Sequence, residues 1–475
     1  MIPLLTIYFL VIILLILIGV FHYAEGYDYS YSIIVLALSL CSILCYILNI
    51  RKYQDIKNKV LKPSILLLCG MCIIAFQNII DLIIGNTGVD AEVFCYNSII
   101  TKGLAYGAIA IVAYVIGYIA TSNSFSLLYS RERESWPIHF LVFAHACLSV
   151  LFIFSLNNDF FTGQAYIDSG DISQSHTNNS EVLLDIFSTA ILIQYAINNK
   201  GRLSNFSQFI RNLPKLFLLF FSIYIILTLI SGSRFPVLKN ILLLTFSYIY
   251  CCRKQPFRNS FIIALLAIGS FIFTIVSFGR VLVTDDLSEK YTIGIEGFEN
   301  RKSFSPTTLE LANSQYCDMA AINIFEQTDT PHLYGAIQGR YLAVIMLPNR
   351  ILQKIWPVSI EMQGSAYFLT AKEIGLDSEM GLGSTIQTDF YVDFGLIGMI
   401  ICMILVGVLF KKIDLMLYSD RDKSYHLLAV LIAIYIGACA LYLARSAFIP
   451  MLKIPIYAFL LLKLNKFLFN HSNSV

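Results

Sequence analysis

Apolar residues come in long blocks along this 475-residue chain, and short polar connections separate most of the blocks. A helix needs roughly 20 apolar residues to cross the ~30 Å hydrocarbon core of a bilayer, and the blocks have about that length. The pattern therefore predicts an all-α integral membrane protein with about twelve transmembrane helices. The predicted spans are residues 3–22, 32–49, 63–84, 100–121, 138–157, 182–199, 213–231, 236–252, 260–279, 386–410, 426–444 and 448–468.

The composition agrees with a membrane protein. Hydrophobic residues make up 57% of the chain and charged residues 13%, which leaves too little polar surface to cover a water-soluble globule of this size. The net charge of +2 comes from basic residues that are spread through many connections and form no single stripe, so nucleic acid is excluded as a partner. Membrane lipids are the partner that the composition predicts.

The basic residues in the connections indicate an orientation. Connections 23–31, 85–99 and 158–181 contain no Lys or Arg and carry acids instead, whereas the alternate connections are rich in Lys and Arg. Basic loops stay on the cytoplasmic side, so we expect both termini in the cytoplasm. The first block has no basic segment before it and no A-x-A-like site after it, so we expect a retained helix and not a removed signal peptide.

One connection on the opposite side, residues 280–385, is much longer than the rest. Ser305, Pro306 and Glu310 are typical of a helix start, so we expect one helix from about 305 to 327 and a second from about 335 to 347. The loop divides the chain into spans at 1–279, a large and partly helical external loop at 280–385, and spans at 386–475. Such a loop is where a membrane enzyme would hold a substrate, and a lid or partner-binding cap is the alternative.

Cysteine usage predicts no metal centre. Most of the eleven cysteines fall within or beside predicted spans, where thiols behave as small apolar groups, and no Cys/His cluster has zinc spacing. We expect Cys95 and Cys317 on the external side, and whether they form a disulfide stays open because spacing does not show that they meet. We expect neither a metal nor another cofactor.

Five arginines on the side where basic residues are otherwise scarce are candidates for a function. They are Arg234 in the tight connection LISGSRFPVLKN, Arg280 in VSFGRVLV, Arg340 and Arg350 in an amphipathic part of the long loop, and Arg445 in the last short external connection. A guanidinium binds two phosphate oxygens at once, so Arg234 and Arg280 are predicted to clamp a pyrophosphate, with Arg340 as a third candidate. The alternative is that each one snorkels to lipid headgroups or pairs with a nearby acid.

The stretch GSTIQTDFYVDFGLIG places two acids, Asp389 and Asp393, one turn apart at the external end of a span. Ser384 and Gln387 have capping-box spacing, so we expect the helix to begin near 385. Asp389 is a candidate general base for a sugar hydroxyl, and the alternative is that these acids only stabilise the positive end of the helix dipole. His332 in TPHLYG is a second candidate base because an imidazole titrates near neutral pH, and an ordinary loop histidine is the alternative.

With these residues the chain resembles the O-antigen polymerases of the Wzy type. The resemblance lies in the order of an arginine in a tight external hairpin, an arginine at the next exit, a large external loop and several short motifs. The motifs are SGSR, FGR, Tyr334-Gly335, Pro348-Asn349-Arg350 and GSTIQTDFYVDFGLIG. Two of them depart from the family pattern, because Asn349 interrupts a Pro-Arg pair and the Glu-x-Tyr-x-x-Phe-Gly-x-x-Gly pattern begins here with Asp389.

The resemblance implies a GT-C-like helical core in a bacterial inner membrane, with the active site facing the periplasm. It implies a metal-independent glycosyltransferase that joins oligosaccharide repeat units of O-antigen or a similar polysaccharide, carried on undecaprenyl pyrophosphate, with a chain-length regulator and a flippase as further partners. The catalytic candidates are then Asp389, His332 and Asp393. The substrate-binding candidates are Arg234, Arg280, Arg340, Arg350, Tyr334, Tyr391 and Arg445.

Other functions stay open at this point. An O-antigen ligase would use the same arginines and differ in its acceptor. A flippase or other transporter also has about twelve spans, but its charges should line a path at mid-membrane, often with broken helices in symmetric halves. A non-enzymatic member of an assembly complex would not need the external arginines.

Overall fold

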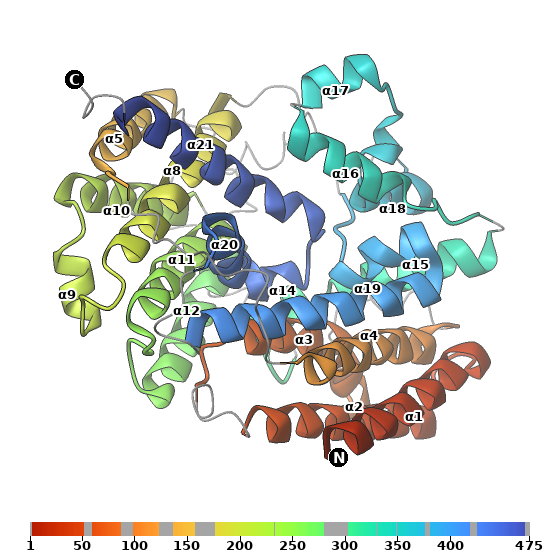
Figure 1. Cartoon of the computed structure of the whole chain (residues 1–475). Helices are drawn as coiled ribbons and strands as arrows, with labels where there is room; N and C mark the ends of the chain where they lie inside the picture. The colour runs from red at the N-terminus through yellow and green to blue at the C-terminus, as the bar shows by residue number, and fades with distance from the viewer. Residues whose placement is uncertain are drawn as a thin grey trace.

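The computed structural model describes residues 2–51, 59–86, 98–122, 136–156, 176–231, 233–279, 303–328, 330–347, 349–375, 381–418 and 425–470. This part of the chain is all-helical (Figure 1). Each predicted span overlaps one helix. These helices are α1 (Ile2–Tyr23), α2 (Tyr29–Ile50), α3 (Pro63–Ile83), α4 (Ile100–Ala120), α5 (His139–Ser155), α8 (His176–Asn198), α10 (Lys215–Ile230), α11 (Arg234–Cys252), α12 (Asn259–Gly279), α19 (Ile386–Tyr418), α20 (Leu427–Leu443) and α21 (Lys453–Asn470).

Length and composition identify the helices that can cross a membrane. Within the described residues, seven helices are long and apolar enough, namely α1, α2, α3, α4, α8, α11 and α19. Helices α5, α10 and α20 and the first half of α12 are shorter apolar helices. The chain is therefore a multi-pass membrane protein.

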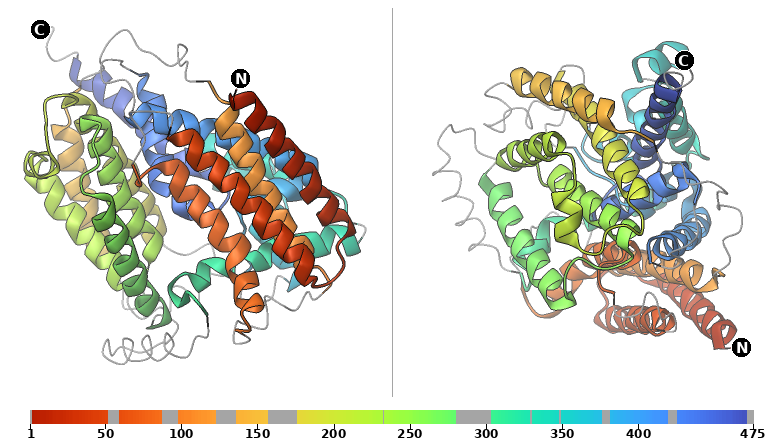
Figure 2. Two further views of the ribbon diagram at one scale, coloured as in Figure 1. Left: turned by 90° about the horizontal axis from the view of Figure 1, so that it is seen from below. Right: turned by 60° about the vertical axis from the view of Figure 1, so that its left-hand side comes forward.

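Helix α4 lies at the centre of the bundle and is almost entirely buried. It packs against α1, α2 and α3, and most extensively against α19. A Cβ at Gly117 of α4 would meet the backbone of Ile404, and one at Gly407 of α19 would meet the backbone of Tyr114. Glycine thus lets the two backbones approach closely, which favours helix association where lipid is as apolar as the side chains. Figure 2 shows α1 and α2 side by side on one flank of this centre and α10 to α12 on the other.

The described part of the long loop packs against one end of the bundle, which we call the loop end. Its elements are η3 (Pro306–Thr308), α14 (Leu309–Ala312), α15 (Gln315–Gln327), α16 (Ala336–Met346), α17 (Asn349–Ile355), η4 (Ile360–Gln363) and α18 (Ser365–Glu373). The last two turns of α3 hold the start of this segment, because the Asp81 carboxylate accepts from the Phe304 amide at 2.8 Å and the Gln77 side chain donates to the Ser305 carbonyl at 2.8 Å. The loop is thereby fixed to the spans.

The predicted helix at 305–327 is wrong as one continuous element. It is divided into η3, α14 and α15, with a break at Asn313 and Ser314. Both residues favour turns over helix interiors, and the amides of Ser314 and Cys317 bond three residues back as in a tight turn. The break also releases the Ala312 carbonyl, which accepts from Asn78 of α3 at 3.0 Å. The second predicted helix, at 335–347, corresponds to α16.

Two expectations about α19 also need correction. The helix begins at Ile386, but its cap is the Thr385 hydroxyl, which accepts from the Thr388 amide at 3.1 Å, and not the predicted capping box. In addition, the span is not continuous, because Gly395 has φ 66° and ψ −169° and separates residues 386–394 from 396–418. Glycine alone adopts this conformation readily. Gly395, which follows Phe394, therefore produces a kink in the helix.

Candidate functional site

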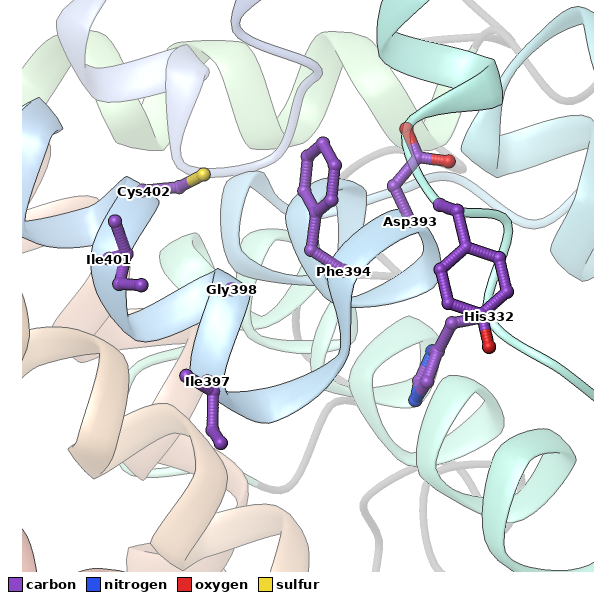
Figure 3. Close-up of a pocket in the computed structure, with 8 residues that line it drawn as sticks. His332, Asp393, Phe394, Ile397, Gly398, Ile401 and Cys402 are labelled. Atoms are coloured by element: carbon purple, nitrogen blue, oxygen red, sulfur yellow. The ribbon is translucent and has the colours of Figure 1, made fainter.

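A pocket of about 450 Å³ opens beside the kink in α19 (Figure 3). Its polar lining residues are His332 and Asp393, which Figure 3 shows at one end, and Tyr334. Its other wall is apolar and follows the second part of α19 through Ile397 and Ile401. The remaining lining residues are Phe394, Gly398 and Cys402. Because the chain turns at Gly395, the polar end and the apolar wall face one pocket.

Backbone pairing fixes the polar end of the pocket. The amides of Leu333 and Tyr334 donate to the carbonyls of Val392 at 3.1 Å and Asp393 at 2.8 Å. Tyr334 has a φ of 50° and Gly335 a φ of 88°, so two successive left-handed residues turn the chain into α16. A tyrosine at positive φ is strained, and such strain often marks a functional site. Its side chain is 84% exposed at the rim of the pocket.

Aromatic rings hold His332 in place. Its ring stacks on Phe325 at 4.3 Å between centroids and meets Tyr391 edge to face at 5.2 Å. Tyr391 is buried, and its ring centroid lies 5.3 Å from that of Tyr106 of α4. Tyr391 was predicted to bind substrate, but it is not among the residues that line the described pocket. Burial lowers the pKa of His332 below its ordinary 6.5, so the imidazole is neutral at pH 7 and able to accept a proton.

The two predicted acids of α19 both face the start of α16, but they have different partners. The Asp393 carboxylate accepts the backbone amides of Ile337 at 3.2 Å and Gln338 at 2.8 Å, an arrangement that the positive end of a helix favours. Asp389 accepts from the Ser365 hydroxyl at 2.7 Å and the Gln338 side chain at 2.9 Å. Both carboxylates are fully buried. Asp393 lines the pocket, and Asp389 is absent from the described lining.

A third buried acid, Asp318 on α15, escaped the sequence reasoning. Its carboxylate accepts from the Thr388 hydroxyl at 2.5 Å, from the Gln387 side chain at 2.9 Å and from the Thr385 hydroxyl. Burial raises the pKa of Asp318 from 3.8 to about 6, and these hydrogen bonds partly offset the rise. The one available signal was a lone acid in the mostly apolar stretch CDMAAINIF. Asp318 ties the loop to the first turn of α19.

Two of the predicted arginines meet on the other side of the loop end. Arg234 is the first residue of α11, and its guanidinium forms an ion pair with Glu310 of α14. The Arg445 guanidinium lies 3.6 Å from the same carboxylate oxygen and donates to the Glu310 carbonyl at 3.4 Å. The neighbouring rings of Phe235 and Tyr442 stack at 4.0 Å, which holds the arginine-bearing ends of α11 and α20 together.

The other predicted residues do not join this pair in the described structure. Arg340 on α16 is buried and donates to the Gln353 side chain at 2.9 Å. Arg280, the side chain of Arg350, and Cys95 lie outside the described residues. The Arg234–Arg280 clamp therefore stays a prediction, and whether Cys95 and Cys317 form a disulfide stays open.

The acid side and the arginine side are linked through the backbone. The amide of Ile386, the first residue of α19, donates to the carbonyl of Ala444, the residue before Arg445, at 3.2 Å. We use "acid side" for Asp318, Asp389, Asp393 and His332, and "arginine side" for Arg234, Glu310 and Arg445. Both sides therefore lie at the loop end, where the start of α19 contacts the segment that follows α20.

No protein-family model, no curated protein and no solved structure matches the chain. Any functional conclusion must therefore come from the residues. The site combines a neutral imidazole beside an apolar wall, buried carboxylates with neutral donors, and two guanidinium groups that share one acid.

Proposed function

We propose that this protein is a membrane glycosyltransferase that polymerises oligosaccharide repeat units carried on polyprenyl pyrophosphate. The observation that supports it most is the pocket, whose polar end at His332 continues into an apolar wall along α19. A lipid-linked sugar has the same two parts, a polar head that reacts and a hydrocarbon chain that remains in the bilayer. The resemblance to O-antigen polymerases of the Wzy type supports the same conclusion from the motifs.

The proposed reaction joins two lipid-linked units. A hydroxyl of the acceptor sugar attacks the anomeric carbon of the donor, the new glycosidic bond forms, and the bond from that carbon to the pyrophosphate oxygen breaks. His332 takes the hydroxyl proton, for which its neutral imidazole at the pocket is suited. The electron pair leaves with polyprenyl pyrophosphate, and arginines of the loop end stabilise the negative charge that develops. Pyrophosphate is already a good leaving group, so this chemistry needs no nucleotide.

The acids support this arrangement. Both oxygens of Asp389 have donors and its carboxylate lies behind the described pocket lining, so we assign it to positioning α16 and α18 through Gln338 and Ser365. Asp393 orders the first turn of α16 and thereby the segment that carries His332. The proposed setting is a bundle of about twelve spans with a GT-C-like core, both termini in the cytoplasm of a bacterium and the loop end facing the periplasm.

One alternative has an observation of its own. A transporter of lipid-linked oligosaccharide would use broken helices and charges within the membrane, and the chain has a kink at Gly395 and an ion pair inside the bundle. That pair joins Lys239 of α11 to Asp185 of α8 at 2.5 Å, and the Tyr435 hydroxyl donates to Asp185 at 2.9 Å. A ligase remains the nearest alternative because it differs from the polymerase in its acceptor alone.

The test uses the purified full chain in nanodiscs, with lipid-pyrophosphate-linked repeat units as the sole substrate and a chelator present. A ladder of lengthened lipid-linked glycans on a gel, formed about 100-fold more slowly by His332→Ala, is the expected result. Transfer of the same lipid between leaflets without a ladder would overturn the polymerase and support the transporter. Transfer to a different lipid acceptor without chain growth would support the ligase.

A further inference from the structure

Glu310 occupies the space between the two arginines of the loop end. Its carboxylate is in contact with both guanidinium groups, one from α11 and one from the end of α20. The side chains are partly open to solvent, with exposed fractions of 24% for Arg234, 32% for Glu310 and 35% for Arg445. An acid of the loop thus holds a pair of cations that would otherwise attract a dissolved anion.

The location of Glu310 allows another anion to displace it from the two arginines. It lies on α14, a helix of four residues between η3 and the break at Asn313. Ion pairs that are open to water contribute little net stability, since each charge is nearly as well solvated apart. The arginines, in contrast, begin or follow long helices whose ends are fixed by the Phe235–Tyr442 stack. The acid can therefore leave more readily than the cations can move.

We infer that Glu310 is a tethered competitor for the pyrophosphate site formed by Arg234 and Arg445, an inference that rests on the proposed function. A pyrophosphate carries at least two charges and offers oxygens to both guanidinium groups at once, so it displaces a single carboxylate. The displaced group stays attached to the loop and keeps a high effective concentration near the site.

The tether has its main consequence after transfer. The released polyprenyl pyrophosphate has one more ionisable oxygen than the sugar-linked substrate, so two arginines alone would bind the product more tightly than the substrate. When Glu310 returns to Arg234 and Arg445, it lowers the affinity of the site for substrate and product alike and accelerates release of the product. Product release limits turnover in many enzymes, and a built-in competitor prevents the site from remaining occupied.

The experiment measures binding of farnesyl pyrophosphate, which has the product's head group and no sugar, to the full chain in nanodiscs at low salt. We expect Glu310→Gln to lower the Kd about tenfold. The gain should vanish when Arg445→Ala is added, because the second cation is then missing. Glu326→Gln is the matched control, since Glu326 pairs with Lys102 at 2.6 Å on the same loop and touches neither arginine. Its Kd should equal that of the wild type.

A Glu310→Gln variant that binds no more tightly than the wild type overturns the inference. If that variant does not fold, Glu310→Asp supplies the test, because it keeps the charge on a shorter arm and should give a Kd between the two. An equal or weaker affinity in Glu310→Asp would again overturn the inference. Binding is measured without sugars, so a failed polymer ladder with a tighter Glu310→Gln variant rejects the polymerase and leaves the anion site standing.

Discussion

The charged groups of the acid side and of the arginine side differ in their burial and in the partners that stabilise them. On the acid side, Asp318, Asp389 and Asp393 are buried, and within the described residues their partners are hydroxyl, side-chain amide and backbone N–H groups, with no cation paired to them. On the arginine side, two cations share one carboxylate and all three groups remain partly exposed. Neutral hydrogen-bond donors therefore stabilise the carboxylates of the acid side, and opposite charges stabilise the groups of the arginine side.

This difference teaches which groups are fixed and which can exchange. A buried carboxylate with several donors is costly to move because each donor would lose its partner. A partly exposed ion pair loses little when a stronger anion replaces one member. In the proposed enzyme the acid side should control the rate of the chemical step, and the arginine side should control substrate and product binding together with the charge of the leaving group.

The arginine side should give the largest loss. Arg234→Ala is expected to lower the rate of polymerisation by about 100-fold or more, because one group that stabilises the leaving pyrophosphate is removed. Arg234→Lys should restore little, since an ammonium lacks the planar fork that binds two oxygens. The measurement is the rate of ladder formation in nanodiscs with equal amounts of folded protein.

Lys102→Ala is the control for that loss. It also removes a cation from an ion pair between a span and the loop, with Glu326, and should leave the rate nearly unchanged. Full activity in Arg234→Ala would remove the arginine side from the reaction.

On the acid side, His332→Ala should lower kcat by about 100-fold, the lower end of what general base catalysis contributes. Asp389→Asn should cost about tenfold or less if Asp389 only positions its neighbours, because an amide oxygen still accepts from Ser365. The reverse order of the two effects would return the role of base to Asp389. Both variants should bind the donor as tightly as the wild type, which separates them from the arginine variants.

The pH profile gives an independent reading of His332. The base must be unprotonated, and burial lowers the pKa of His332 below 6.5. Wild-type kcat should therefore rise as the pH rises through that lowered value and stay level at neutral pH. The rise should be missing from the residual activity of His332→Ala.

The kink in α19 is what brings the two parts of the pocket together. Gly395→Ala should cost about 1–3 kcal/mol of stability, because its backbone conformation is nearly closed to other residues. The new Cβ would also lie 3.0 Å from Nε2 of His332, so we expect about tenfold lower activity as well. Thermal unfolding and ladder formation measure the two effects.

Gly339→Ala is the matched control for the kink variant. Gly339 lies within α16, and no other group lies within 4 Å of the position a Cβ would take. Equal unfolding temperatures for the two variants would show that an alanine side chain at position 395 does not strain the backbone of the kink.

The sequence predicted the positions of the apolar helices well, but it could not show which candidate residues of the site lie together, for physical reasons. A membrane requires about 20 consecutive apolar residues, and that local signal is readable in α1 to α4 without knowledge of contacts. The kink at Gly395 has no such signal, because one glycine in an apolar run also fits a continuous helix. The contacts of Glu310 and Asp318 join residues that are far apart in sequence, with Glu310 meeting Arg234 and Asp318 meeting Thr385. Pairing at such distance depends on the packed fold.

Asp318 gives the smallest expected effect, and its sign follows from the pKa. Burial raises the pKa of Asp318 to about 6 in the folded chain, above the ordinary 3.8, so the folded state holds this proton more tightly than the unfolded state. Its contribution to stability is therefore largest below about pH 4 and is lost as the pH rises to about 6. Asp318→Asn has no proton to lose, so the unfolding temperature of the wild type relative to this variant should fall by a few degrees across that range. A wild type that gains stability relative to Asp318→Asn as the pH rises would show that burial does not raise the pKa of Asp318.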